Sequence, residues 1–316
     1  MYKLCRMNAA STGSVWQGRA DGPRWHHIVT TDIPTGGVAL VGFCSDEGVR
    51  RNEGRVGAAA GPAALRAALS GFAVQEPFLL ADAGDVTTHG PDLESAQREL
   101  SDTVRDLIAK DNLVVVLGGG HETSFASHRG AYEALGNMQI VNFDAHFDLR
   151  QADRPTSGTP FLQIAEMVGK DAFDYSVIGI SKPNNTKVLF DTAEELGVRV
   201  VLDEELLGLS PQQAAERALE LVAGDKPIHL SIDLDLLPAW VAPGVSAPAG
   251  LGVALEQVYA MVKAVASTGR VRLVDVVELN PTYDIDGRTA KVAARLIEAI
   301  VGACHVASIS KKPLEH

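Results

Sequence analysis

The stretch Leu113–Asp148, LVVVLGGGHETSFASHRGAYEALGNMQIVNFDAHFD, decides the fold class. Two short apolar runs, Leu113–Leu117 and Gln139–Phe143, flank a segment with a helical pattern at 123–135. Runs that are largely apolar, rather than alternating with polar residues, are typical of strands buried on both faces. A strand, a helix and a second strand in this order form the unit of a parallel sheet covered by helices. The stretch therefore predicts an α/β protein.

The same alternation continues along most of the chain from about residue 38. We expect strands at Val38–Phe43, Phe78–Ala81, Leu113–Leu117, Gln139–Phe143, Ser176–Ile180, Val198–Leu202, Ile228–Ile232 and Val271–Val277. We expect helices at 61–70, 92–110, 123–135, 160–169, 187–196, 210–223, 254–267 and 288–303. About eight such units fit either a closed barrel or an open, doubly wound sheet, and periodicity alone does not choose between them.

The composition is that of a folded protein with an excess of acid. Of 316 residues, 46% are hydrophobic and 22% charged, with 28 Lys and Arg against 40 Asp and Glu and a formal net charge of −12. Such a charge repels a phosphate backbone, so nucleic acid is not an expected partner. No basic amphipathic stretch suggests binding to an anionic membrane surface. The remaining question is whether some carboxylates are gathered around cations.

The cysteines and the apolar segments of the chain indicate the cellular compartment. Cys5, Cys44 and Cys304 are odd in number and widely spaced, which argues against a disulfide framework and suits a reducing compartment. The absence of a Cys-x-x-Cys pair argues against a thiolate zinc site. Without an apolar signal-peptide core or a long apolar segment, we expect a cytoplasmic protein. Residues 314–316 read as the remnant of an expression tag and are left out of the fold argument.

The strongest local feature is the sequence DAHFD at 144–148, directly after the run Gln139–Phe143. Because side chains alternate along an extended chain, Asp144, His146 and Asp148 point the same way. Burying two carboxylates and an imidazole together is costly unless a cation compensates their charge. A divalent metal ion does this. The alternative is a polar loop that has this spacing by chance.

Three further motifs follow predicted strands. SIDLD at 231–235 places Asp233 and Asp235 on one face, where two ionised carboxylates need a cation or a shared proton. GGGHE at 118–122 places His121 after three glycines, which let backbone approach a ligand closely. ELNP at 278–281 adds Glu278. The alternative for SIDLD is that its aspartates only cap a helix or form a turn. The alternative for GGGHE is that His121 has a structural role.

The four motifs are stronger evidence for a functional site together than singly, because all of them follow predicted parallel strands. The carboxyl ends of parallel strands meet at one edge, where open α/β sheets and barrels both build their sites. Two histidines, four aspartates and one glutamate would converge there. Oxygen and nitrogen ligands with carboxylates able to bridge suit two metal ions, and the lack of thiolate favours Mn²⁺.

Together the motifs GGGHE, FDAHFD, SIDLD and ELNP resemble the signatures of the ureohydrolase superfamily of arginase, agmatinase and formimidoylglutamase. They span residues 118–281, and residues 57–66 resemble a further motif of the superfamily. The resemblance implies a single arginase-like domain over residues 1–316. It also implies a three-layer α/β/α sandwich around a parallel, eight-stranded sheet, and so decides for the open sheet over the barrel.

Within the superfamily the chain looks most like the formimidoylglutamase branch. The supporting strings are SVWQGR at 14–19, GFCSDEGVRRNEGRVG at 42–57, HFDLR at 146–150 and SGTPF at 157–161. Two positions depart from the arginase pattern: Gly120 stands where arginase has Asp, and Ser157 where it has a histidine that assists proton transfer. The branch implies hydrolysis of N-formimidoyl-L-glutamate to L-glutamate and formamide in histidine degradation. By analogy with the superfamily's trimers and hexamers, it also implies a homo-oligomer.

The resemblance implies two Mn²⁺ per subunit. The ligands of one ion would be His121, Asp144, Asp148 and Asp233. The ligands of the other would be Asp144, His146, Asp233 and Asp235, so that two aspartates bridge the pair. Asp148 would also move a proton from the attacking hydroxide to the leaving nitrogen, and Glu278 would hydrogen-bond the cationic amidinium.

The two carboxylates of such a substrate need a local cation in an acidic protein. Arg150 is the candidate, because a guanidinium binds a carboxylate bidentately. Ser157 and Asn185 are further candidates for the substrate's polar end. The loop at 50–52, with two arginines and an asparagine, is a weaker one.

Three other hypotheses compete with this interpretation. An amidinohydrolase of the guanidinobutyrase, agmatinase or arginase type would share metals and fold but release urea, and Ser157 and Arg150 speak against it. A single-zinc deacylase of related fold would not need Asp148 and Asp235, which a second metal explains better. A non-catalytic protein on this fold would be expected to have lost metal ligands, and none of the six is missing.

Overall fold

The fold is that of a computed structural model, which describes residues 15–311. The expectations for Cys5, for the first residue of the string at 14–19 and for the tag-like residues 314–316 lie outside the described residues. Within residues 15–311, no helix is both long and apolar enough to cross a membrane.

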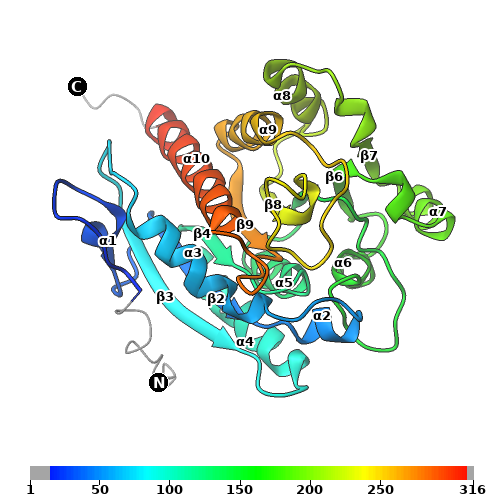
Figure 1. Ribbon diagram of the computed structural model, residues 1–316, viewed down its shortest axis with the longest axis horizontal. Helices are drawn as coiled ribbons and strands as arrows, with labels where there is room; N and C mark the ends of the chain where they lie inside the picture. The colour runs from blue at the N-terminus through cyan, green and yellow to red at the C-terminus, as the bar shows by residue number, and fades with distance from the viewer. Residues whose placement is uncertain (1–14, 312–316) are drawn as a thin grey trace.

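A single parallel sheet forms the centre of the molecule (Figure 1). Its strands, in chain order, are β1 (Val29–Thr30), β2 (Val38–Cys44), β3 (Leu80–Thr87), β4 (Leu113–Leu117), β5 (Gln139–Phe143), β6 (Asp174–Ile180), β7 (Arg199–Leu202), β8 (Ile228–Asp233) and β9 (Val271–Val277). In space they lie in the order β1-β3-β2-β4-β9-β8-β5-β6-β7, and every neighbouring pair is parallel.

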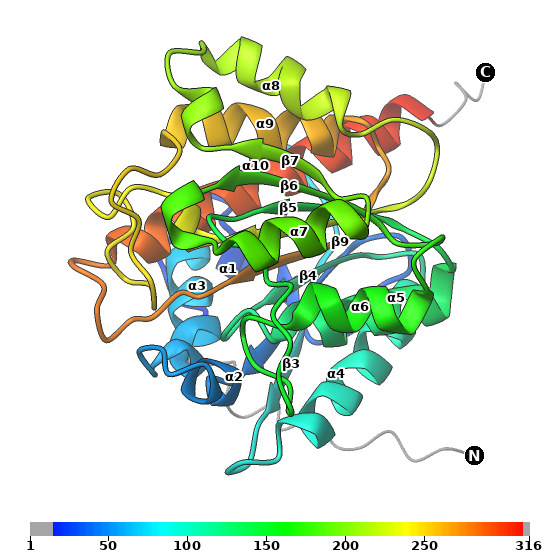
Figure 2. The same cartoon turned by 90° about the vertical axis from the view of Figure 1, so that its right-hand side faces the viewer.

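The helices form a layer on each face of the sheet. Their bounds are α1 (Trp25–Ile28), α2 (Glu47–Arg51), α3 (Gly61–Ser70), α4 (Leu93–Ile108), α5 (Thr123–Leu135), α6 (Pro160–Val168), α7 (Lys187–Glu195), α8 (Pro211–Glu220), α9 (Leu255–Ser267) and α10 (Arg288–Lys311). Helices α3, α10, α9 and α8 pack in sequence on one face, and α4, α5 and α6 on the other. Figure 2 shows α8 and α9 above β5, β6 and β7, and α5 and α6 below these three strands. The predicted three-layer α/β/α sandwich is confirmed.

The core explains why the strands could be recognised in the sequence. One apolar cluster joins the sheet to α3, α8, α9 and α10, and two smaller clusters join it to α4 and α5 and to α6 and α7. All five residues of β5 are buried, as are the last four of β4. Strands covered by helices on both faces carry few polar residues, and their apolar runs stand out.

The order of the strands determines where a site can form. After β4 the chain passes through α5 to β5, and the two places between these strands are filled later by β8 and β9. The four central strands β4, β9, β8 and β5 therefore present their carboxyl ends side by side. In open α/β sheets, ligands bind outside these ends, where the strand order changes direction.

Three differences from the expectations have physical causes. The sheet has nine strands, because the two-residue β1 pairs with the edge of β3. Strand β3 begins two residues later than predicted and runs to Thr87, because the buried guanidinium of Arg66 pairs with Asp82 and also contacts Asp85 within this strand. The short α1 and α2 were not expected, since helices of four and five residues show no periodic pattern.

Candidate metal centre and pocket

The predicted ligand residues meet at the carboxyl ends of the four central strands. His121 follows β4, Asp144 and His146 follow β5, and Asp233 and Asp235 lie at the end of β8. Two groups of side chains could each hold a metal ion. The first is His121, Asp144, Asp148 and Asp233, and the second is Asp144, His146 and Asp235. Within each group, the ligand atoms lie within 4.8 Å of one another.

The first group surrounds one nitrogen of His121. Its Nδ1 lies 2.9 Å from Asp148 Oδ2, 3.0 Å from Asp233 Oδ2 and 3.2 Å from Asp144 Oδ2. None of these contacts has the geometry of a hydrogen bond, so Nδ1 is buried without a hydrogen-bond partner among the described residues. A nitrogen and three carboxylate oxygens that converge on one point, instead of pairing directly, fit the donor set of a divalent metal ion.

The second group is more open. His146 Nδ1 lies 3.1 Å from Asp235 Oδ2 and 3.6 Å from Asp144 Oδ1. The His146 side chain is 22% exposed, whereas the two aspartates are buried. The other oxygen of Asp235, Oδ1, is buried with no hydrogen-bond partner among the described residues. This group, too, has the nitrogen and carboxylate donors that Mn²⁺ accepts.

Local hydrogen bonds fix the carboxylates in place. Asp144 Oδ1 accepts a bond of 2.7 Å from the His146 backbone N–H, and Asp233 Oδ1 accepts one of 2.8 Å from the Asp235 N–H. The backbones of Asp148 and Glu278 have φ values of 50° and 67°, in the left-handed region that non-glycine residues seldom adopt. Such conformations cluster at functional sites, where the surrounding structure compensates their cost.

The electrostatics indicate that this cluster needs cations. Burial alone would lower the pKa of His121, but its three carboxylate neighbours outweigh burial and raise that pKa well above the usual value. Burial likewise opposes the rise in the pKa of His146, which Asp235 and Asp144 nevertheless raise to about 12. Burial raises the pKa of Asp233 well above its usual range, and the negative neighbours Asp235 and Asp144 add to this effect. Four carboxylates exceed the charge of two imidazolium rings, so the cluster favours added positive charge.

Glu278 lies beside the first group. Its Oε1 accepts a hydrogen bond of 2.8 Å from the His121 N–H, while Oε2 is buried without a partner among the described residues. Burial, with the nearby charge of Glu122, raises the pKa of Glu278 to about 8. An acceptor oxygen with no protein partner is suited to receive a hydrogen bond from a cationic ligand.

Glu122 accounts for the glycine at position 120. A Cβ atom at Gly120 would lie 2.1 Å from Glu122 Oε2, so the glutamate already fills the space of a side chain there. Glu122 Oε1 accepts hydrogen bonds of 2.9 Å from Ser45 Oγ and from the Gly48 N–H. The carboxylate thus connects the start of α5 to α2, a role that the sequence argument did not assign.

A hollow of about 320 Å³ lies over the cluster. Besides the cluster and Glu278, its lining includes Arg150, Ser157, Asn52 and Arg55. The Asn52 amide donates a bond of 3.2 Å to Ser157 Oγ. The Arg150 guanidinium is exposed and makes no hydrogen bond or ion pair with any residue in the range 15–311. Sequence reasoning did not single out Arg55, although it lies within the string at 42–57 that supports the formimidoylglutamase resemblance.

Other candidates lie outside this hollow. The Asn185 amide donates to the backbone oxygens of Ala145 and Ser181 and accepts from the Phe147 N–H, so it supports the loop after β5, and Asn185 does not line the hollow. Both arginines of the 50–52 loop pair with Glu47. The half-buried Cys44 and Cys304 do not line the hollow either, and neither forms a disulfide.

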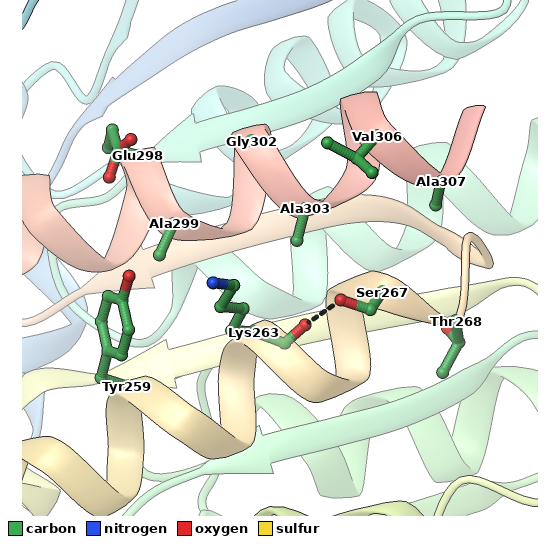
Figure 3. A pocket seen from close by; sticks show the side chains of 10 residues that line it. All are labelled: Tyr259, Lys263, Ser267, Thr268, Glu298, Ala299, Gly302, Ala303, Val306 and Ala307. Atoms are coloured by element: carbon green, nitrogen blue, oxygen red, sulfur yellow. Dashed lines mark hydrogen bonds between the residues drawn. The ribbon is translucent and has the colours of Figure 1, made fainter. Parts of the chain in front are cut away.

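A larger hollow of about 640 Å³ lies elsewhere, between α9 and α10 (Figure 3). Small residues such as Ala299, Gly302 and Ala303 form much of its wall. Its charged side chains, Lys263 and Glu298, form no cluster with metal-binding spacing. The chemistry therefore points to the smaller hollow over the strand ends, although it has half the volume.

Known proteins are similar to this chain in sequence and in fold. Residues 36–302 match the model of the arginase family, so the chain belongs to that family and is an enzyme. A formimidoylglutamase from Corynebacterium efficiens is 48% identical over 298 residues, which cover 91% of this chain and 94% of that protein.

Solved structures show the same architecture. The chain is similar to the formiminoglutamase of Trypanosoma cruzi with Mn²⁺, at 27% identity and a TM-score of 0.78 over 88% of this chain and 95% of that one. It is equally similar to a proclavaminate amidino hydrolase from Streptomyces clavuligerus, at 28% identity and a TM-score of 0.77 over the same shares of the two chains. These two neighbours are named for different enzymes. The architecture therefore identifies the family, and the choice of substrate has to be argued from the residues of the pocket.

Proposed function

We propose that this enzyme hydrolyses N-formimidoyl-L-glutamate to L-glutamate and formamide, as a cytoplasmic step of histidine degradation. One observation carries the proposal: a single hollow is lined by the His/Asp cluster, by Glu278 with its unpaired carboxylate oxygen and by the unpaired guanidinium of Arg150. The proposed substrate has a cationic amidine at one end and carboxylates at the other. Relatives named formimidoylglutamase, up to 48% identical along most of their length, support the same choice.

The cluster would hold two Mn²⁺. One ion would be held by His121, Asp144, Asp148 and Asp233, and the other by Asp144, His146 and Asp235. We assign Asp233 to the second ion as well, as the sequence motifs predict. When bound, two such ions lower the pKa of water and so supply hydroxide near neutral pH. The unpaired Nδ1 of His121 and Oδ1 of Asp235 support this assignment, because a metal ion would give them partners.

Asp148 is the proposed proton carrier. Its carboxylate lines the hollow and its pKa is raised, first by burial and then by the charge of Asp144. A carboxylate whose pKa lies above the usual value is a better acid and base near neutral pH. In the reaction, the oxygen of the attacking water would bond to the formimidoyl carbon, and Asp148 would take a proton from it. The bond from that carbon to the glutamate nitrogen would then break as Asp148 delivers the proton to the leaving nitrogen.

Binding is assigned to the remaining lining residues. Glu278 Oε2 would accept a charge-assisted hydrogen bond from the amidinium, and Arg150 would pair with a carboxylate of the glutamate portion. Ser157, whose hydroxyl accepts a bond from Asn52, would contact the substrate through its remaining hydrogen. This position offers no imidazole, which favours the formimidoyl substrate over a guanidino acid.

The test is a product assay on Mn²⁺-loaded protein offered N-formimidoyl-L-glutamate, guanidinobutyrate, agmatine and arginine in parallel. We expect formamide and glutamate from the first and little urea from the others. Urea from a guanidino compound, with no formamide from formimidoylglutamate, would refute the proposed substrate but not the proposed metal centre.

A further inference from the structure

A line of buried polar side chains lies behind His121, on the side away from the hollow. His121 Nε2 lies 3.1 Å from Ser231 Oγ, and Ser231 in turn contacts Asp275 Oδ1. Ser231 and Asp275 are register partners on the adjacent strands β8 and β9, which explains their close approach. Both side chains are fully buried.

Asp275 is surrounded by donors. Its Oδ1 accepts from Ser231 Oγ and, at 3.1 Å, from Ser124 Oγ. Its Oδ2 accepts at 2.6 Å from Ser127 Oγ and lies 2.7 Å from His229 Nε2. Although burial opposes it, the charge and hydrogen bond of His229, followed by the charge of His121 and the hydrogen bond from Ser127, lower the pKa of Asp275 to about 2, so the carboxylate is anionic at neutral pH.

The count of protons along this line fixes which nitrogen of His121 keeps its proton when the other nitrogen binds a metal ion. A serine hydroxyl has one hydrogen, and an anionic carboxylate can only accept. Ser124 Oγ also lies 3.2 Å from Ser231 Oγ, but Ser231 makes the closer contact with Asp275 Oδ1 and donates its hydrogen there. Only lone pairs of the Ser231 oxygen remain for His121. The contact at 3.1 Å is then a hydrogen bond from His121 Nε2–H to Ser231.

A neutral imidazole with its proton on Nε2 has a lone pair on Nδ1. That Nδ1 atom is the one surrounded by Asp144, Asp148 and Asp233. With the opposite tautomer, Nδ1 would present a proton to the place where a metal ion needs an electron pair. Partners of this kind orient metal-binding histidines and set their tautomer.

We propose that Asp275 is a positioning residue of the metal centre: acting through Ser231, it keeps the proton of His121 on Nε2 and so makes Nδ1 available to a metal ion. The inference rests on the metal centre proposed above. Asp275 touches neither the hollow nor the first group of ligands, and its influence passes through one hydroxyl.

The test uses Asp275→Asn and Ser231→Ala, with Ser127→Ala as the matched control. Ser127 donates to the other oxygen of Asp275 and makes no contact with Ser231. Mn²⁺ is titrated into the metal-free full-length proteins by calorimetry, and the bound ions are examined by electron paramagnetic resonance. Circular dichroism and thermal unfolding of the metal-free proteins check the fold.

We expect both Asp275→Asn and Ser231→Ala to weaken one of the two Mn²⁺ sites about 10- to 100-fold, the usual effect of losing such a partner. The resonance signal at low Mn²⁺ should then be that of single, uncoupled ions, whereas the wild type and Ser127→Ala give the signal of a coupled pair.

Wild-type affinity at both sites in folded Ser231→Ala would overturn this inference and leave the proposed function unaffected. An equal loss in Ser127→Ala would also overturn it, because the effect would then be a general one of core packing. A wild-type protein that binds no Mn²⁺ would refute the proposed function together with this inference.

Discussion

Replacing Arg150 by alanine tests the assignment of the substrate's anionic end. The Arg150 guanidinium lines the hollow and has no competing partner in residues 15–311, so removing it leaves no protein carboxylate unpaired. The change should therefore act on binding and leave the free energy of unfolding nearly unchanged.

The size of the effect follows from the exposure of this side chain. Hydrogen bonds to charged groups contribute about 1.5–3 kcal/mol, which corresponds to a loss of affinity of roughly 10- to 150-fold. Because Arg150 is exposed and its interaction is screened by water, we expect the lower end, about 10-fold in KM. The kcat value should stay within a factor of two or so, because Arg150 is assigned to the carboxylate end of the substrate and takes no part in the proton transfer assigned to Asp148.

The assay measures formamide release against substrate concentration for wild type, Arg150→Ala and Arg150→Lys, at low and moderate salt. Arg154→Ala is the matched control, because Arg154 is an exposed arginine of the same loop that contacts Pro91 and Glu94 and does not line the hollow. Arg150→Lys should fall between wild type and Arg150→Ala, since lysine keeps the charge but loses bidentate pairing. An unchanged KM in Arg150→Ala, or an equal rise in Arg154→Ala, would refute the anchoring role.

Three further predictions concern the cluster itself. Asp148→Asn should lower kcat about 10²- to 10⁴-fold in protein shown by metal analysis to keep Mn²⁺, and full activity in such protein would refute the proton-carrier role. Gly120→Ala should cost about 1–3 kcal/mol in urea unfolding, because its Cβ would lie 2.1 Å from Glu122 Oε2, and wild-type stability would show that this space is not filled. Because the raised pKa values of His121 and His146 keep protons on the metal-free cluster, Mn²⁺ must displace them, so affinity should rise with pH by about tenfold per unit for each proton released. Calorimetry in buffers of different ionisation enthalpy measures that release, and a pH-independent affinity without it would contradict the prediction.

The sequence predicted most of the sheet because its strands are covered on both faces. The bounds of Leu113–Leu117, Gln139–Phe143 and Val271–Val277 agree with β4, β5 and β9. Strand β3 was harder to place, because it carries Asp82 and Asp85, and these charges are accommodated by the distant Arg66 and, at Asp82, also by Trp16. A pairing between residues far apart in the chain leaves no local signal.

The site was predictable to the extent that its residues follow strands. His121, Asp144 and Asp233 were expected to converge, and the structure brings them together at one nitrogen. Asp275 was missed because it lies within an apolar strand, and no motif surrounds it. A lone carboxylate in such a run was the available signal, since a buried charge requires partners. The hydrogen bonds of Asn185 to backbone groups could not be predicted, because they depend on the loop conformation.

The most direct test of the metal centre is anomalous X-ray diffraction from crystals of the Mn²⁺-loaded protein, recorded at the manganese absorption edge. The account predicts two anomalous peaks about 3.5–4 Å apart, the spacing of two-metal hydrolytic sites. One peak should lie within bonding distance of His121 Nδ1 and the other within bonding distance of His146 Nδ1, with Asp144 between them. A single peak, or peaks away from these two nitrogens, would contradict the account.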